Sequence, residues 1–284
     1  MSAAPVTRFF EVYPGNVRMP PVRTDVRLVY DDRSVYVGIR AHDPNAAVIR
    51  SALARRDQSL ADQDYVEVLL DPLNARQNAL LFRTNPHGVH TDGQYDEASR
   101  LRDFSSDFDF DVRTSVTAAG WMAEFRIPFA TLRHREGSTG PWAFVVYRNW
   151  PRHVTTTIAS VPTPRSATCL LCFAAEAEGI TPVSRPQAYS VVPYVAFARR
   201  ADRAGGSSDR ARTGFDAKWQ PRSDTAVDLT VEPDFSQVEA DSPQLTANTR
   251  FALSLAEKRP FFLEGTDLFS IYMEIGRASC RERV

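Results

Sequence analysis

The chain has 284 residues, of which 43% are hydrophobic and 24% are charged, and its formal net charge is −1. This composition is typical of a globular protein with one large or two ordinary domains. The near-neutral charge gives no general attraction to nucleic acid or to an anionic membrane, so we expect no nucleic-acid partner. No run approaches the roughly 20 apolar residues of a spanning helix, and the first residues lack the apolar segment of a signal peptide.

The clearest strand signal covers residues 121–127. Trp121, Phe125 and Ile127 fall on one face of this segment, and Glu124 and Arg126 fall on the other. A period of two indicates a half-buried strand rather than a helix. A glycine precedes the segment and a proline, which has no N–H to donate, ends it. A strand with such an inner face needs an apolar sheet opposite, so we place it in the middle of a sandwich.

Eight further segments have the same short length and alternation, namely residues 26–30, 35–41, 64–70, 78–84, 108–117, 142–150, 154–159 and 168–174. Between them, residues 45–60 predict an irregular excursion or a single helical turn, and residues 93–107 predict a long polar loop. Turn signals recur at near-regular spacing and no long helix is predicted. The sequence therefore predicts an all-β, antiparallel, jelly-roll-like β-sandwich over residues 1–178.

The three cysteines do not make a disulfide framework. Cys169 and Cys172 lie in the predicted strand 168–174, which places them about 10 Å apart on opposite faces. This separation is too long for a disulfide. A zinc site needs two more ligands, and no second Cys-x-x-Cys or paired histidine follows.

The pattern changes after residues 179–187, which contain glycine and prolines and read as a linker. Residues 188–200, 212–219 and 225–232 predict strands of roughly ten residues with aromatic residues near their ends. Long, weakly alternating strands with terminal aromatics are typical of transmembrane barrels. A second soluble sheet fits the pattern equally well.

An ordered set of motifs over some 150 residues resembles the family 9 carbohydrate-binding module in its divergent bacterial form. The motifs include residues 24–32 (Thr-Asp-Val-Arg-Leu-Val-Tyr-Asp-Asp), residues 64–71 (Asp-Tyr-Val-Glu-Val-Leu-Leu-Asp), residues 85–88 (Asn-Pro-His-Gly), and Gly120-Trp121 followed by Ile127-Pro128-Phe129. This resemblance implies a β-sandwich that binds polysaccharide or oligosaccharide. The Asp-Gly…Asp-Glu…Trp segment with which such modules begin is missing, so we expect a truncated N-terminus.

Residues 228–241 (Asp-Leu-Thr-Val-Glu-Pro-Asp-Phe-Ser-Gln-Val-Glu-Ala-Asp) and 257–265 (Glu-Lys-Arg-Pro-Phe-Phe-Leu-Glu-Gly) carry a second resemblance. They are similar to the start of a domain of unknown function that follows such modules in cell-envelope proteins and looks like an outer-membrane barrel. Residues 188–273 are therefore expected to form the first strands of an incomplete β-barrel. Residues 274–284 look like a translated sequencing adaptor, and we leave them out of the fold.

A sugar site combines flat aromatic rings with a few fixed amide, carboxylate and guanidinium groups. The candidates are Trp142, Arg148 and Trp150, which share a strand face, and Asn149, which points the other way. Trp150 is the first choice because it lies at a strand end, where a ring can be exposed. Core packing is the alternative for both tryptophans.

Oxygen-rich loops hold Ca²⁺, and family 9 modules are associated with structural calcium. The candidate ligands are Asp57, Asp62, Asp64 and Asp92. Their spacing is not that of an EF-hand, and solvated loop carboxylates are the alternative. We expect no other cofactor.

These features together predict a non-catalytic carbohydrate-binding module of a bacterial cell-envelope or secreted protein, involved in glycan capture or breakdown. The chain contains no Gly-x-Ser-x-Gly, His-Glu-x-x-His or phosphate-binding glycine motif. Two alternatives stay open. One is a structural or gating domain of an outer-membrane barrel without sugar affinity. The other is an accessory part of an envelope hydrolase that acts on O-glycosyl bonds.

Overall fold

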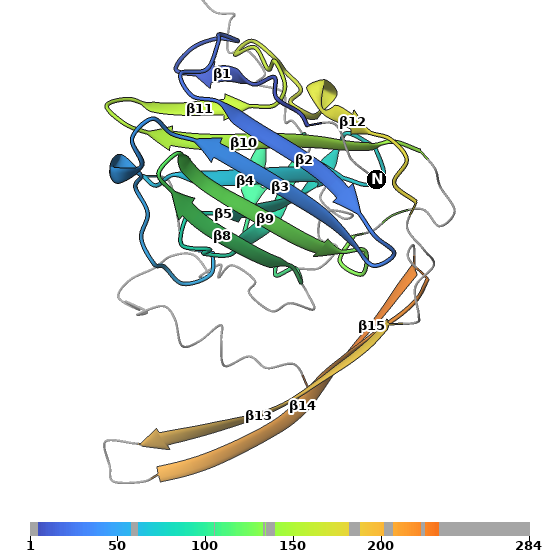
Figure 1. Ribbon diagram of the computed structural model, residues 1–284. Coiled ribbons are helices and arrows are strands. Elements are labelled where there is room, and N and C mark those ends of the chain that lie inside the picture. Colours follow the sequence, from blue (N-terminus) through green and yellow to red (C-terminus); the bar gives the residue numbers. More distant parts are fainter. Residues whose placement is uncertain are drawn as a thin grey trace, which may run out of the picture.

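Two facing antiparallel sheets make up the larger part of the computed structural model, which describes residues 5–57, 62–104, 106–132, 134, 140–181, 188–201, 207–222 and 225–232. The front sheet in Figure 1 has four strands in the order β2-β3-β9-β8. Their bounds are β2 Thr24–Tyr30, β3 Ser34–His42, β8 Asp111–Thr117 and β9 Gly120–Pro128.

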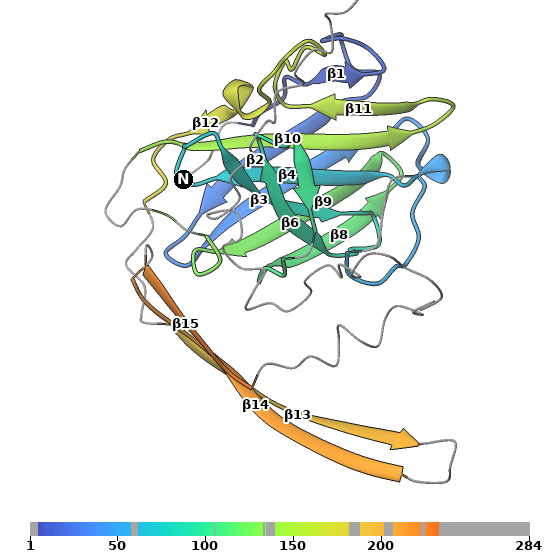
Figure 2. The ribbon, with the colours of Figure 1, turned by 180° about the vertical axis from the view of Figure 1, so that it is seen from behind.

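The sheet behind it has eight strands in the order β1-β11-β10-β4-β5-β6-β7, and β12 pairs with β10 beside this path. Their bounds are β1 Phe10–Tyr13, β4 Tyr65–Asp71, β5 Asn78–Thr84, β6 Thr91–Asp96, β7 Leu101–Asp103, β10 Trp142–Pro151, β11 Thr155–Ala159 and β12 Ala175–Ala177. Figure 2 shows this sheet from the side that points away from the four-stranded sheet, which we call the outer face.

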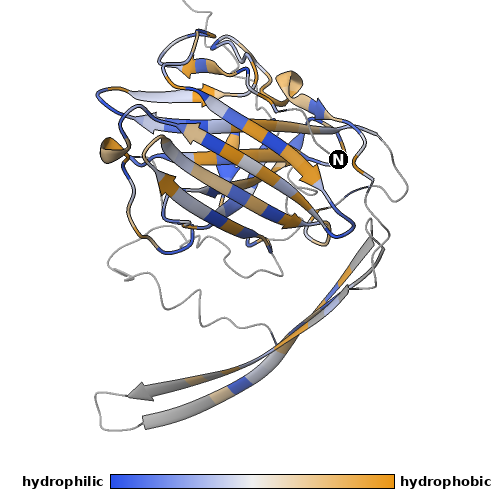
Figure 3. Ribbon diagram, viewed as in Figure 1, coloured by the Kyte–Doolittle hydropathy of each residue, from blue (hydrophilic) through white to orange (hydrophobic). Residues whose placement is uncertain are grey.

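The main core lies between the two sheets. Trp121 is 1% exposed and Phe125 is 0% exposed, and both belong to this core together with Val68, Phe82 and Val146 of the facing sheet. Apolar and polar residues alternate along β2, β3, β8 and β9 in Figure 3, as a sheet with one buried face requires. The predicted all-β antiparallel sandwich is confirmed.

The predicted polar loop at residues 93–107 is wrong, because β6 covers residues 93–96 and β7 covers residues 101–103. Gly93 explains the pairing of these two strands. A Cβ atom on Gly93 would lie 2.1 Å from the carbonyl oxygen of Asp103, so only glycine lets the backbones approach this closely. The excursion after β3 contains one short 3₁₀ turn, Ala46–Val48, as expected.

The predicted strand at residues 168–174 is also wrong. This segment forms a 3₁₀ turn at Leu171–Phe173, and the Cα atoms of Cys169 and Cys172 lie 5.5 Å apart and carry a disulfide bond. A helical turn brings residues three apart onto one side, whereas a strand places them on opposite faces. The prediction that the two cysteines form no disulfide depended on the predicted strand, and both predictions are wrong.

A separate three-stranded antiparallel sheet follows, in the order β13-β14-β15. Its strands are long and curled (Figure 1), with bounds β13 Ala188–Ala201, β14 Ser207–Arg222 and β15 Thr225–Val231. The core of the sandwich reaches Ile180, which is 1% exposed. In the described ranges no helix has the length and apolar character needed to cross a membrane. Residues 233–284, with the predicted adaptor segment 274–284, lie outside the described residues.

The sandwich core allows a direct stability test. Phe125→Ala removes a fully buried ring from β9, and we expect it to lower the free energy of unfolding by about 3–5 kcal/mol. Glu124→Ala on the exposed face of the same strand is the matched control, with an expected change within about 0.5 kcal/mol. Urea denaturation measures both values. Equal effects of the two variants would contradict the inward orientation of Phe125.

Candidate functional site

The strongest concentration of polar chemistry lies on the outer face of the eight-stranded sheet. Antiparallel pairing places Glu67 of β4 opposite Arg83 of β5 and Tyr147 of β10. Arg102 of β7, which β5 and β6 separate from β4 in the sheet, reaches the same carboxylate. We call Glu67, Arg83 and Arg102, with the rings of Tyr65, Tyr95, Phe104 and Tyr147 around them, the Glu67 cluster.

Both oxygens of the Glu67 carboxylate are held. Arg83 Nε donates to Oε2 at 2.9 Å, and its Nη2 donates to the same oxygen. Arg102 Nε donates to Oε1 at 3.0 Å. Burial alone would raise the pKa of Glu67, but the guanidinium groups of Arg102 and Arg83 outweigh it and hold this pKa below its usual value. The carboxylate is therefore charged and fixed in orientation.

Aromatic rings sandwich the two arginines. The Cζ atom of Arg83 lies 4.4 Å from the ring centroid of Tyr65 and 5.0 Å from that of Phe104. Arg102 lies 5.5 Å from the ring of Tyr95 and 5.7 Å from that of Tyr147. Cation–π contacts of this kind stabilise a planar guanidinium where little water is present. Burial raises the pKa of Tyr95 to about 12, so this phenol stays protonated at neutral pH.

The cluster opens to solvent at Arg102. Its side chain is 32% exposed, whereas that of Arg83 is 10% exposed and that of Glu67 is 1% exposed. The half-buried rings of the cluster, Tyr65 and Phe104, flank Arg83, whereas the rings on Arg102, Tyr95 and Tyr147, are buried. An approaching ligand would therefore meet the exposed edge of the Arg102 guanidinium and, at Arg83, two partly exposed rings. Sequence analysis missed Glu67, Arg83 and Arg102 as site residues, because their strands are brought together only by pairing.

The predicted sugar-contacting residues lie elsewhere, apart from Asn149. Asn149 shares the outer face with the Glu67 cluster, but it is 3% exposed and its Nδ2 donates to the carbonyl oxygen of Gln63 at 2.8 Å. Trp142 is 2% exposed and packs against Phe129 and His134. A ring buried in this way presents no face to a sugar, so the prediction for Trp142 is corrected to core packing.

Arg148 and Trp150 belong to a buried ion network between the two sheets. Arg148 is 0% exposed, and its Nη1 donates to the carbonyl oxygen of Arg23 at 3.1 Å. Trp150 Nε1 donates to Asp43 Oδ2 at 2.8 Å, and the guanidinium of Arg152 covers its ring at 4.9 Å. The structure therefore gives Arg148 and Trp150 contacts that join the sheets, and the Trp150 ring at the strand end is half-buried.

The predicted calcium ligands do not come together. Asp64 is fully buried and accepts a hydrogen bond from Arg152 Nη1 at 2.9 Å, and Asp62 is exposed. Only Asp57 and Asp92 meet, and Asp107 joins them, with carboxylate oxygens within 4.8 Å of one another.

Arg56 already forms ion pairs with all three carboxylates. Its Nη2 lies 2.7 Å from Asp92, and its Nε lies 3.0 Å from Asp107 and 3.6 Å from Asp57. A guanidinium in this position repels a divalent cation, and Ca²⁺ needs six to eight oxygen ligands. The arrangement does not fit a calcium ion, and the acidic group is an ion-pair cluster that fastens the loop before β8.

The same cluster makes stability depend on pH. Burial raises the pKa of Asp92 to about 6 from its usual 3.8. The folded protein then holds a proton that the unfolded chain releases, so this stability is full below about pH 4 and is lost as the pH rises through about 6. We expect the urea midpoint to fall across this range and Asp92→Asn to flatten the fall. Asp109→Asn, an exposed carboxylate of the same loop, is the control. An unchanged slope in Asp92→Asn would contradict the assignment.

The fold and the site define an antiparallel β-sandwich that carries a polar and aromatic cluster on one sheet face. A family model described as carbohydrate family 9 binding domain-like matches residues 2–150, and the chain belongs to this family. The resemblance seen in the first block of the sequence is thereby confirmed. A second model, of a domain of unknown function (DUF5916), matches residues 185–272.

Two solved structures of a family 9 carbohydrate-binding module from Caldicellulosiruptor kristjanssonii are similar to the chain. The complex with cellotriose has 19% sequence identity and a TM-score of 0.43, and the match covers 63% of this chain and 88% of that chain. The complex with glucose has 18% identity and a TM-score of 0.42, and the match covers 62% and 86%. No curated protein matches the chain.

Proposed function

We propose that the sandwich binds carbohydrate through the Glu67 cluster on the outer face of its eight-stranded sheet. Membership of the carbohydrate family 9 binding domain-like family supports the class of ligand. The observation that carries the position is the fixed Arg102 guanidinium, which is 32% exposed in the same cluster as the half-buried rings of Tyr65 and Phe104 that flank Arg83. Sugars offer hydroxyl groups to such donors and C–H faces to such rings.

Glu67 and Arg83 act in this proposal as positioning residues. Glu67 holds Arg102 through Oε1 and Arg83 through Oε2, so the donor edge of Arg102 is set before a ligand arrives. A site that is ordered in advance loses less conformational entropy on binding. Sugar recognition then depends on the arginine and the rings, while the carboxylate sets their geometry.

Isothermal titration with mono- and oligosaccharides, including glucose and cellotriose, tests this site. Arg102→Ala removes the exposed donor, and we expect the dissociation constant to rise at least tenfold, which corresponds to about 1.4 kcal/mol. Arg113→Ala removes an exposed arginine of β8 in the other sheet and serves as the control. Trp150→Phe loses the contact with Asp43 but is expected to keep the affinity. Loss of binding in Trp150→Phe, with normal binding in Arg102→Ala, would contradict a site at the Glu67 cluster and would favour a sugar site at Trp150.

We further propose that the chain belongs to a bacterial envelope protein whose barrel begins with β13–β15 and captures glycans for breakdown. The two faces of this sheet differ in the way that a membrane strand requires. One face carries exposed apolar side chains, namely Tyr189, Val191, Val195, Phe197, Trp219, Val227, Leu229 and Val231. The other face carries Arg212, Asp216, Lys218 and Thr230, together with the exposed Val192 opposite Asp216.

The lengths of two of the three strands agree with this proposal. β13 has 14 residues and β14 has 16, and a tilted strand needs about 9–11 to cross the hydrocarbon core; β15 has seven in the described range. The pair Tyr189 and Trp219 lies side by side near one end of the sheet, where interfacial aromatics gather in barrels.

Refolding the chain from urea in the presence of phosphatidylcholine vesicles tests the membrane proposal. Flotation with the vesicles is the expected result, and Phe197→Arg on the apolar face should reduce the floated fraction severalfold, since an arginine that faces lipid at the bilayer midplane costs about 2–4 kcal/mol. Arg212→Glu on the polar face is the matched control. Equal flotation of both variants, or none of the unaltered chain, would contradict lipid contact and favour a soluble gating sheet.

A further inference from the structure

The Cys169–Cys172 disulfide closes a ring within one surface loop and joins no two strands. The two cysteines are three positions apart, Cys172 is exposed and Cys169 is half-buried. In the chain-entropy account, so short a loop gives the smallest stabilisation of any disulfide. Stabilising the sandwich is therefore a poor explanation for this bond.

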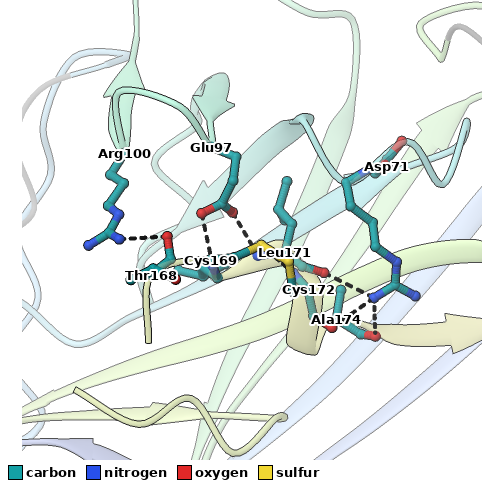
Figure 4. The surroundings of a disulfide bond; sticks show 10 residues. Asp71, Glu97, Arg100, Thr168, Cys169, Leu171, Cys172 and Ala174 are labelled. Carbon is teal, nitrogen blue, oxygen red and sulfur yellow. Dashed lines mark hydrogen bonds between the residues drawn. A yellow bond between two sulfur atoms is a disulfide. The ribbon is translucent and has the colours of Figure 1, made fainter. Parts of the chain in front are cut away.

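Three charged side chains hold the same loop without the disulfide (Figure 4). The Glu97 carboxylate accepts hydrogen bonds from the backbone N–H of Leu170 at 2.8 Å and of Leu171 at 2.7 Å. Arg76 Nη1 donates to the carbonyl oxygens of Leu171 and Cys172, both at 3.1 Å. Charge-assisted bonds of this kind are the strong ones in proteins.

The third charged side chain is Arg100, which comes from the turn between β6 and β7, as Glu97 does. Its Nη2 donates to the carbonyl oxygen of Thr168, immediately before Cys169. Arg76 comes from the turn between β4 and β5 and also pairs with Glu176 of β12 at 2.6 Å. We call Arg76, Glu97 and Arg100 the loop clamp. Because the clamp bonds to the backbone, the loop keeps its shape when the sulfur–sulfur bond opens.

The sulfur atoms are arranged for exchange. The backbone N–H of Cys172 donates to Cys169 Sγ at 3.1 Å, and a donor in this position stabilises a thiolate on Cys169. Thiol–disulfide exchange is fastest when the attacked sulfur is accessible and the leaving sulfur is a stabilised thiolate. Cys172, exposed, fits the attacked position and Cys169 fits the leaving position.

We propose that Cys169 and Cys172 form a reversible thiol–disulfide exchange site for dithiol partners. One thiolate of the dithiol attacks Cys172 Sγ, a mixed disulfide forms, and the Cys169 thiolate leaves. The second thiol of the partner then attacks the mixed disulfide and releases the Cys172 thiolate. The chain gains two electrons and, after protonation, two thiols, and the dithiol becomes a cyclic disulfide. The reverse sequence closes the ring again.

The test uses the full chain with Cys280→Ser, so that the pair holds the only cysteines. Dithiothreitol at neutral pH, without denaturant, is expected to open the bond within minutes, and maleimide labelling followed by mass spectrometry then finds two added labels. The reduced protein should melt within about 2 °C of the oxidised one. Oxidised dithiothreitol should restore the bond. A bond that resists reduction until the protein unfolds, or a larger drop in melting temperature, would overturn the proposal.

A second variant tests the loop clamp itself. Arg76→Met removes the bonds to the Leu171 and Cys172 carbonyls, and we expect ring closure by oxidised dithiothreitol to slow severalfold, because the two thiols are no longer held together. The opening rate should change less. Arg113→Met on β8 is the matched control. Equal closure rates in Arg76→Met and the control would show that the clamp does not preorganise the pair, and would overturn the mechanism.

Discussion

The pleat of β4 and β10 is the constraint on which the rest of the sandwich depends. Both strands are buried on both faces, so each position must serve one of two environments. Val66, Val68 and Leu70 enter the core between the sheets, and Glu67 and Leu69 face outward. A slip of one residue would put the Glu67 carboxylate into the apolar core without Arg83 and Arg102, at a cost of several kcal/mol. The position of the site and the register of the sheet are therefore set together.

Period-two alternation was enough to predict the inner face. Trp121, Phe125 and Val146 lie where the pattern places them. Burial of one face against a facing sheet requires apolar residues at every second position, and this alternation can be seen within a single strand. The residues that bury the outer face of β4 and β10 could not be predicted from alternation within one strand. It comes from β6 and β7 and from the 3₁₀ turn that contains Leu171, which are distant in sequence from β4 and β10. An apolar strand sequence does not show whether loops or another sheet bury its second face.

The site residues were harder to predict because pairing among charges is not local. The chain has 34 basic and 35 acidic residues, so the sequence offers many partners for each arginine. Trp150 was expected to be exposed because it ends a strand. It is instead held by Asp43, which follows β3 of the facing sheet and therefore meets the end of β10 in space. The Cys-x-x-Cys segment failed for a local reason, since an apolar run of seven residues fits a strand and a turn equally well.

Arginine pairs with buried carboxylates at three places in the described part of the sandwich, and the differences between these places show which one suits a ligand. Arg152 is buried between Asp43 and Asp64. Arg56 is 40% exposed, but its guanidinium already pairs with the carboxylates of Asp57, Asp92 and Asp107. In the Glu67 cluster the ratio is reversed, with two guanidinium groups on one carboxylate. The planar fork of arginine can satisfy one partner and still present donors on its other edge. Only there, among the described residues, do aromatic rings flank an arginine pair that shares a single acid and opens to solvent, which is the chemistry that a sugar requires.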